Sequence, residues 1–349
     1  MPEGNLDFVI TGDFRYPGGT SAAIAEEIKI LKNSTLSWKL DQFDSKVFRD
    51  REINEKVSML VSPSDFLGAE RTECDTWFVH NPHCLRWGIP ERRIDAKKIV
   101  IVAHQAPLSF VGKFYYNPWK IDAWFRKAHP ESEVIWAPIS PLCRRMFEVS
   151  GFDGSLLNFD WYNVFSGPFD DPEGIEDRRL ARVGCHGRPQ AEKWPATRAE
   201  ALAVYPDDDG FQVTLLGPDR KLSGPIFPYP ARWTVYEFNE IAVEEYLRMI
   251  DFFVYWPSPD LVEAFGRTIA EAILNGKLAV LPRSLEPTFG DLAVYADPWT
   301  VRSVVESFQA DPGRYFRTVT YAAMKARNLY GPSGLESRFD KVRTMPPDS

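Results

Sequence analysis

Short apolar runs alternate along the chain with amphipathic segments, and this alternation predicts the fold class. Buried strands separated by helical patterns are typical of parallel sheets with helical crossovers, so we expect an α/β protein. The predicted strands span residues 6–11, 56–61, 76–80, 97–104, 134–140, 181–185, 211–217, 252–258 and 277–281.

The composition changes at residues 166–179. This segment, SGPFDDPEGIEDRR, combines glycine, proline and acidic residues between two sets of predicted strands. A chain of 349 residues is long for a single hydrophobic core, and it suits two domains of about 150 residues each. We therefore predict an N-terminal domain at 1–165, a C-terminal domain at 178–320 and closing helices at 321–349.

The composition also indicates a globular protein of a reducing compartment. Hydrophobic residues make up 44% of the chain, and the four cysteines include no C-x-x-C pair. The N-terminal residues MPEGNLD lack the blocks of a signal peptide, and no apolar run approaches the roughly 20 residues of a membrane span. The net charge of -8 argues against a general nucleic-acid partner. We expect a cytoplasmic location, with peripheral contact at the inner face of a membrane left open.

Two glutamates in the run EAFGRTIAEAILNGKLAVL are the main candidates for chemistry. Glu263 and Glu271 have seven residues between them. The period of the apolar residues predicts a helix that starts after a Phe-Gly and ends at a glycine before a buried strand. Backbone N–H groups near Gly266, Arg267 and Thr268 would form an anion site suited to a diphosphate. The carboxylates would then accept hydrogen bonds from sugar and ribose hydroxyls.

A second pair of candidates lies upstream, in RVGCHGRPQAEKW. Arg188 and Lys193 are five residues apart and can converge on one anion. Two fixed cations would bind a diphosphate.

The N-terminal region repeats the strand-then-helix arrangement. Gly18 and Gly19 follow the first predicted strand and open a helix, which lets backbone approach a phosphate. No G-x-G-x-x-G occurs, so we set aside a nicotinamide or flavin enzyme. His104 ends another predicted strand, at the carboxyl edge of a parallel sheet, where ligands bind.

The glutamate pair around Phe265 and Gly266, with its following glycine and strand, resembles the retaining GT-B glycosyltransferases of family four. The resemblance implies two Rossmann-like domains whose parallel sheets face each other across a cleft, with closing helices that cross back to the N-terminal domain. It also implies retaining transfer of a sugar from a nucleoside diphosphate sugar to a glycan, lipid-linked or small-molecule acceptor. No metal ion is expected.

The same resemblance implies roles for single residues. Glu271 would bind the donor ribose, and Glu263 would face the donor sugar near its reactive carbon. Arg188 and Lys193 would neutralise the leaving diphosphate in place of a metal.

The resemblance extends to the N-terminal domain. Gly18 and Gly19 match a glycine pair that lies against the donor phosphates. The family has a histidine facing the donor sugar, and His104 is our match for it, with His80 as the other candidate. The alternatives are a phosphorylase or sugar-nucleotide epimerase on the same fold, and a non-catalytic sugar-nucleotide-binding domain.

Two clusters could be taken for metal sites. Cys74, His80, His83 and Cys84 fall within eleven residues and have side chains that bind zinc. Adjacent His83 and Cys84, however, leave little slack for two ligands on one tetrahedral ion. The aspartates at 207–209 precede a glycine between a predicted helix and strand, which is typical of a turn. We therefore predict no metal site.

Residues 109–129 are unusually aromatic. Aromatic faces stack on sugars and grip acyl chains alike. We therefore predict an acceptor wall or a contact with membrane-bound lipid, with a plain core helix as the alternative.

Overall fold

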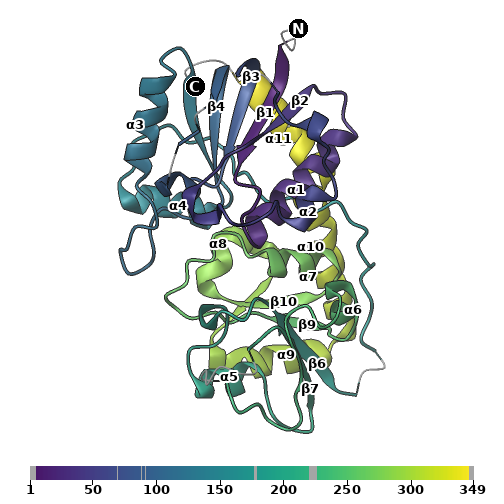
Figure 1. Ribbon diagram of the computed structural model, residues 1–349. Coiled ribbons are helices and arrows are strands. Elements are labelled where there is room, and N and C mark those ends of the chain that lie inside the picture. The colour runs from purple at the N-terminus through teal and green to yellow at the C-terminus, as the bar shows by residue number, and fades with distance from the viewer. Residues whose placement is uncertain are drawn as a thin grey trace. The chain divides into compact units, whose positions relative to one another are not determined.

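The structure, a computed structural model, describes residues 5–68, 70–87, 89–90, 92–176, 179–219 and 226–345 (Figure 1). The chain divides into two compact units. The N-terminal unit comprises Met1–Gly167 with Tyr330–Ser349, and the C-terminal unit is Pro168–Leu329. The break at Gly167 lies within the segment whose composition changes. The expected boundary at 321 falls inside helix α10 (Pro312–Tyr330).

The sheet of the N-terminal unit has five parallel strands in the order β2-β1-β3-β4-β5. Because β1 lies between β2 and β3, the chain reverses its direction of winding beside β1. The strands are β1 (Leu6–Gly12), β2 (Trp38–Gln42), β3 (Arg71–His80), β4 (Arg93–Ala103) and β5 (Glu133–Pro138).

Helices cover both faces of this sheet. Trp77 of β3 packs edge-on against Phe125 of α3 (Pro118–Ala128), with ring centroids 5.6 Å apart. The next residue, Phe78, contacts Phe339 of α11 (Pro332–Thr344) at 5.5 Å. Neighbouring strand residues point to opposite faces, so α3 and α11 lie on opposite sides of the sheet (Figure 1). The other α-helices that the structure describes in this unit are α1 (Gly19–Lys32), α2 (Glu55–Ser58) and α4 (Pro141–Ser150).

The strand predicted at 56–61 is wrong. Part of this segment forms α2, where the Asn54 side chain accepts a hydrogen bond from the Lys56 backbone N–H at 3.1 Å. The strand that pairs with β1 on that side is instead β2, in which Leu40 and Asp41 are buried. The sequence WKLDQ is short and carries two charges, so its pairing depends on contacts with β1 rather than on its own pattern.

The sheet of the C-terminal unit has six parallel strands in the order β11-β10-β9-β6-β7-β8. Its winding reverses between β6 and β9. The strands are β6 (Ala181–His186), β7 (Phe211–Leu216), β8 (Thr234–Tyr236), β9 (Phe252–Val254), β10 (Leu278–Pro282) and β11 (Val294–Ala296). The three-residue strands β8 and β11 were not predicted, because they are too short to show a pattern.

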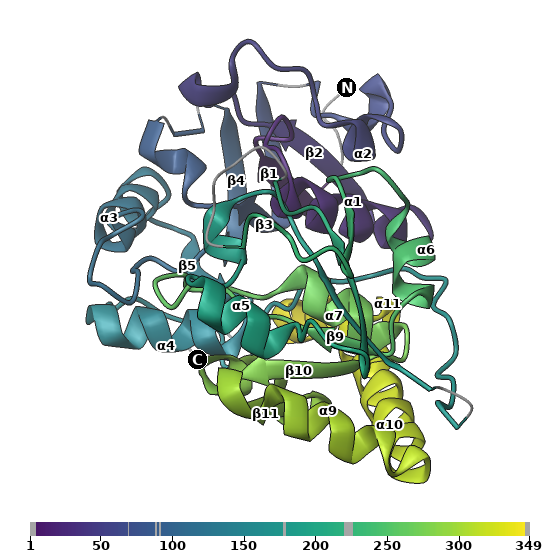
Figure 2. The same cartoon turned by 90° about the horizontal axis from the view of Figure 1, so that it is seen from below.

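Helices also cover both faces of the second sheet. Figure 2 shows α7 (Arg267–Leu274) and α9 (Val301–Gln309) on opposite sides of β10. The other α-helices described in this unit are α5 (Arg198–Val204), α6 (Val243–Arg248) and α8 (Glu286–Phe289), together with α10.

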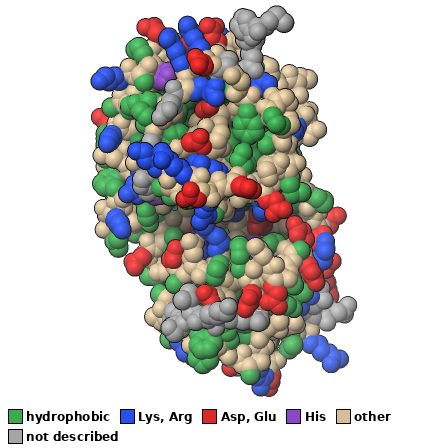
Figure 3. All heavy atoms as spheres, in the orientation of Figure 1, with side chains coloured by type: hydrophobic (Ala, Val, Ile, Leu, Met, Phe, Trp, Pro, Cys, Tyr) green, Lys and Arg blue, Asp and Glu red, His purple; other side chains and the backbone are tan. Residues whose placement is uncertain are grey.

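Charged side chains of both signs are interspersed over the face drawn in Figure 3. The four cysteines are buried and form no disulfide. Among the described residues, no helix combines the length and the apolar character needed to cross a bilayer. The cytoplasmic location stays a prediction.

Candidate functional site

The second sheet places two candidate segments next to each other at its carboxyl edge. Arg188 and Lys193 follow β6, whereas Glu263 follows β9 and leads into α7. Strands β6 and β9 are neighbours, and the winding of the sheet reverses between them. In open α/β sheets, ligands bind in the crevice outside such a reversal.

Lys193 and Glu263 are in direct contact although they are 70 residues apart in sequence. The Lys193 ammonium donates to Glu263 Oε2, and the Tyr255 hydroxyl donates to the same oxygen at 2.5 Å. The side chains of Glu263 and Lys193 are only 12% and 18% exposed. Burial by itself raises the pKa of Glu263, but the charge of Lys193 and the two hydrogen bonds outweigh it, so the pKa is lowered. The site therefore holds an ionised, oriented carboxylate at neutral pH.

The backbone before Lys193 is held closely against the neighbouring strand. The Gly187 N–H donates to the Leu216 carbonyl at 3.0 Å, and the Trp194 indole N–H donates to the Arg188 carbonyl at 3.0 Å. Gly217 has a φ of 101°, and a Cβ there would lie 1.9 Å from the Gly187 oxygen. Only glycine fits this approach. The Arg188 side chain is exposed, so a fixed backbone carries an accessible cation.

Helix α7 starts where the glycine was predicted. Gly266 occupies the capping position with a φ of 80°, and a Cβ there would lie 2.8 Å from Ile269 Cδ1. Phe265 is buried beside Phe289, with ring centroids 6.3 Å apart. Because Gly266 has no side chain to accept from the first turn, the helix begins at Arg267 and Thr268 without a side-chain cap.

Glu271 projects from α7 toward two basic side chains. Its Oε1 lies 3.6 Å from Arg267 Nη2, and its Oε2 lies 3.7 Å from His186 Nε2. His186 is buried at the end of β6, and burial lowers its pKa to about 3, so the imidazole is neutral. The Glu271 side chain is 27% exposed, so it is partly accessible.

Sequence reasoning missed His186 and Tyr255. His186 ends a buried strand at the carboxyl edge, which is the signal that singled out His104. The role of Tyr255 had no signal in the sequence, because only the fold brings its hydroxyl to Glu263.

The glycine pair lies in the N-terminal unit, after β1. Gly18 caps α1 with a φ of 94°, and its carbonyl accepts from the Ala22 N–H at 3.2 Å. Gly19 is the first residue of the helix and is exposed. The segment between β1 and α1 therefore turns at a glycine with a positive φ.

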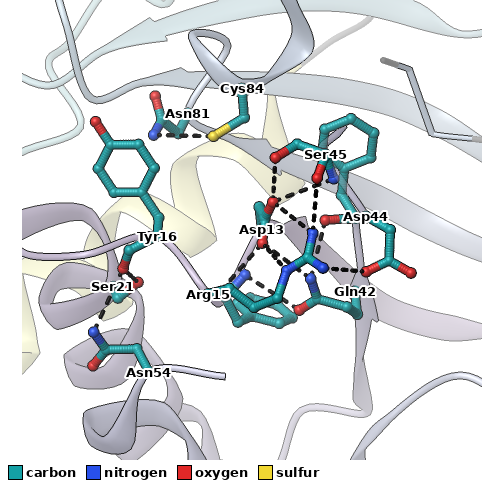
Figure 4. A network of polar contacts seen from close by, with 12 residues as sticks. Asp13, Arg15, Tyr16, Ser21, Gln42, Asp44, Ser45, Asn54, Asn81 and Cys84 are labelled. Carbon is teal, nitrogen blue, oxygen red and sulfur yellow. Dashed lines mark hydrogen bonds and ion pairs between the residues drawn. The ribbon is translucent and has the colours of Figure 1, made fainter. Parts of the chain in front are cut away.

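A polar network fixes the start of that turn (Figure 4). Asp13 is buried and accepts two hydrogen bonds from the Arg15 guanidinium, at 2.8 and 3.0 Å. The Ser45 hydroxyl, from the segment after β2, donates to Asp13 at 2.5 Å. Burial raises the pKa of Asp13, but these donors lower it below its ordinary value. The carboxylate thus ties the loop after β1 to the loop after β2.

The two candidate histidines are in contact with each other. His80 ends β3, His104 follows the neighbouring strand β4, and His80 Nδ1 lies 2.9 Å from His104 Nε2. The His80 side chain is 0% exposed, whereas His104 is half-buried. Of the two rings, His104 is the one that reaches the surface of the unit.

The predicted site residues therefore fall into two groups. Those in the N-terminal unit are Gly18, Gly19, His80 and His104, and those in the C-terminal unit are Arg188, Lys193, Glu263, Phe265, Gly266, Arg267, Thr268 and Glu271.

The side chains of the two candidate metal sites are not brought together in the fold. Within the part of the chain that the structure describes, no three His, Cys, Asp or Glu side chains are arranged to hold a metal ion. Asp208 accepts from the Gly210 N–H at 3.0 Å and pairs with Arg302 at 2.6 Å, as expected for a turn. Cys84 accepts a weak hydrogen bond from Asn81 at 3.6 Å.

The aromatic segment 109–129 has two parts. Phe125 and Tyr116 belong to the core, and the Tyr116 hydroxyl donates to the Gln105 carbonyl at 2.8 Å. Phe110 and Phe114 are 45% and 44% exposed. Part of the segment therefore belongs to the core, and the acceptor wall or lipid contact stays a prediction.

No protein-family model and no curated protein matches the chain. Solved structures do match its fold over nearly the whole length. Anabaena HepE, in complex with UDP and glucose, has a TM-score of 0.63 at 16% identity, covering 97% of this chain and 99% of HepE. The pneumococcal O-GlcNAc transferase GtfA, in complex with UDP and GlcNAc, has a TM-score of 0.56 at 10% identity, covering 98% and 99%. A glycosyltransferase from Rickettsia africae also has a TM-score of 0.56 at 10% identity, covering 98% of both chains.

These similarities establish the fold. Two parallel-sheet α/β units form the GT-B architecture of glycosyltransferases, as predicted.

Proposed function

We propose that the protein is a retaining glycosyltransferase that moves a sugar from a nucleoside diphosphate sugar to a glycan, lipid-linked or small-molecule acceptor. One observation carries this proposal. Lys193, Glu263 and Tyr255 form a largely buried polar cluster at the reversal of the second sheet, next to the α7 helix that bears Glu271. HepE and GtfA were each crystallised with UDP and a sugar, so a UDP-sugar is the first donor to test.

Positive charge at this edge suits a departing diphosphate. Lys193 has three N–H donors, so it can bind a phosphate oxygen while it keeps its contact with Glu263. Arg188 adds an exposed guanidinium, and the first turn of α7 adds backbone donors and the positive end of the helix dipole. Donors that are fixed before the reaction stabilise the leaving charge most effectively.

The two glutamates have different surroundings and take different parts of the donor. Glu271 is partly exposed and has two accepting oxygens, which suits the paired hydroxyls of a ribose. Glu263 is more buried and sits beside Lys193. It accepts from a sugar hydroxyl and stabilises positive charge that develops at the anomeric carbon.

Retention needs no protein nucleophile in this proposal. The bond between the anomeric carbon and the diphosphate oxygen breaks, and the acceptor oxygen bonds to that carbon on the same face. The acceptor proton passes to the departing diphosphate oxygen. For His104 we propose the role that the family resemblance implies, in which a histidine faces the donor sugar.

The diphosphate is held without a metal ion in this proposal, because Arg188 and Lys193 supply the positive charge. Activity that persists in excess EDTA is the expected result. Activity that EDTA abolishes and manganese restores would contradict this part of the proposal.

The test begins with a thermal-shift screen of UDP, GDP, ADP and TDP. A ligand at 100 times its dissociation constant stabilises the folded state by about 2.7 kcal/mol. Turnover is then measured with the matching sugar nucleotides, and NMR of the product reports the anomer. An inverted anomer, or no turnover with any donor, contradicts the proposal.

The same assays separate the alternatives. Turnover with free phosphate indicates a phosphorylase, and conversion of the sugar nucleotide without an acceptor indicates an epimerase. Nucleotide binding without turnover indicates a non-catalytic binding domain.

A further inference from the structure

Three side chains from different elements of the N-terminal unit lie in a row. Glu27 of α1 is buried, and its Oε2 lies 3.4 Å from His80 Nε2. On the other side of the His80 ring, Nδ1 lies 2.9 Å from His104 Nε2. The row runs from a carboxyl group in the core, through one imidazole, to a second imidazole that reaches the surface.

The short contact between the imidazoles couples their tautomers. Two nitrogens at 2.9 Å form a hydrogen bond only if one of them carries the proton. Burial and the neighbouring His104 hold the pKa of His80 well below its usual value, so His80 is neutral and carries one N–H. When that N–H is Nε2–H, His80 Nδ1 accepts from His104 Nε2–H. When it is Nδ1–H, His104 Nε2 accepts and the proton of His104 sits on Nδ1.

The carboxyl group at the inner end selects between these two states. Glu27 Oε2 and His80 Nε2 have no hydrogen-bond partner among the described residues, and these two buried atoms face each other at 3.4 Å. An ionised Glu27 favours the proton on His80 Nε2. A protonated Glu27 donates to that nitrogen and favours His80 Nδ1–H.

The surroundings of Glu27 set its pKa near neutral pH. Burial raises the pKa of Glu27 to about 7, although the Trp161 indole N–H and the Arg338 guanidinium act to lower it. Trp161 Nε1 donates to Glu27 Oε1 at 3.1 Å, and Arg338 of α11 is itself buried. His80 is the third group that faces this carboxyl.

We propose that Glu27 and His80 are positioning residues that set the tautomer of His104, so that the protonation of Glu27 decides whether His104 Nδ1 donates or accepts a hydrogen bond. The change binds one proton at Glu27 and shifts one proton within each imidazole. It rests on the proposed function only in that His104 is taken to face the donor sugar. There a protonated Nδ1 donates a hydrogen bond to a sugar oxygen, whereas an unprotonated Nδ1 accepts one from a sugar hydroxyl. His80 stays neutral in both states.

The test is nitrogen-15 NMR of the histidine rings in the full-length protein without any ligand, which distinguishes the two neutral tautomers from the charged ring. The His104 signals are assigned with His104→Gln. In the wild type we expect both His80 and His104 to change tautomer together with a midpoint near the pKa of about 7. A His104 tautomer that does not change with pH, or a His104 that titrates to the charged ring, overturns the proposal.

Two variants examine the inner end of the row. In Glu27→Gln the pH dependence of the His104 tautomer is expected to disappear, whereas in the control Glu26→Gln it is expected to remain. Glu26 is the neighbouring carboxylate, but it binds Lys29 and Ser166 instead. Arg338→Met removes the charge that favours ionised Glu27, so the midpoint should rise by about one pH unit or more. A midpoint that stays in place in both Glu27→Gln and Arg338→Met also overturns the proposal.

The ligand-free measurement separates this proposal from the proposed function. If the wild type transfers sugar while its His104 tautomer is independent of pH, only the proposed coupling of Glu27, His80 and His104 is contradicted. A coupled tautomer change in a protein that never transfers sugar contradicts only the proposed function. If the enzyme is active, Glu27→Gln is expected to flatten the pH profile of kcat near neutrality while the affinity for the nucleoside diphosphate stays unchanged.

Discussion

Replacing Glu263 by glutamine examines the central contact of the candidate site, because the change removes a charge and keeps the shape. Glu263 and Lys193 are 12% and 18% exposed, so the ammonium of the variant stays partly buried without its ionic partner. Breaking a fully buried pair costs about 3 to 5 kcal/mol. The amide oxygen of glutamine still accepts a hydrogen bond, so we expect the free energy of unfolding to fall by about 1 to 3 kcal/mol.

The stability effect should depend on pH in a defined direction. The pKa of Glu263 in the folded protein lies below its ordinary value of 4.5. A carboxylate with a lowered pKa stabilises the folded state above its unfolded pKa, and this contribution is lost as the pH falls through the folded pKa. The difference in the free energy of unfolding between wild type and Glu263→Gln should therefore be largest at neutral pH and should decrease below about pH 4.5.

Kinetic and binding measurements distinguish a role of Glu263 at the sugar from a role at the diphosphate. Loss of a preorganised charge at the reacting carbon should lower kcat by about 100-fold or more. Lys193 keeps its charge in the variant, so affinity for the nucleoside diphosphate should stay close to that of the wild type. Calorimetry measures the affinity and initial rates give kcat.

Tyr255→Phe is the matched control, because it removes only the hydrogen bond of 2.5 Å to the same carboxylate. In Tyr255→Phe the free energy of unfolding should fall by about 1 kcal/mol, and kcat should fall less than in Glu263→Gln. Full kcat in Glu263→Gln, or a tenfold loss of nucleotide affinity, would refute the reasoning.

Three further predictions concern the same unit. Lys193→Met and Arg188→Met should each cost about 2 to 4 kcal/mol of transition-state stabilisation measured as kcat/KM, and unchanged kinetics in both would rule out their role at the diphosphate. Glu271→Ala should raise the donor KM and weaken nucleoside diphosphate binding by calorimetry, since it contributes mainly to ground-state binding; wild-type binding would remove it from the ribose. Gly266→Ala should lower stability to denaturant by about 1 to 3 kcal/mol, because its φ is 80°. The helical Gly313→Ala should be neutral or stabilising, and equal effects at the two glycines would contradict the backbone argument.

The local pattern of the chain was enough to predict most strands and the boundaries of α7. The alternation of apolar runs and helical periods indicated a parallel α/β fold, and the fold comparisons agree with it. Gly266 could be placed because a helix start after Phe-Gly and a stop at Gly276 depend on backbone angles of single residues. The roles assigned to these residues stay predictions.

Contacts between distant segments could not be predicted in this way. Lys193 reaches Glu263 only because β6 and β9 become neighbours in the sheet, and the order of strands has no signature in either segment. The same is true of His80 and His104, where pairing of β3 with β4 brings two strand ends together.

Register and strand order result from burying apolar faces against partners that are far away in the sequence. The five residues of β2 illustrate this, because their own pattern is weaker than that of 56–61 and their pairing with β1 decides the outcome. Backbone preferences act over a few residues and are visible in the sequence. The environment of a side chain, including whether a carboxylate meets an ammonium or an imidazole, exists only after the sheet has formed.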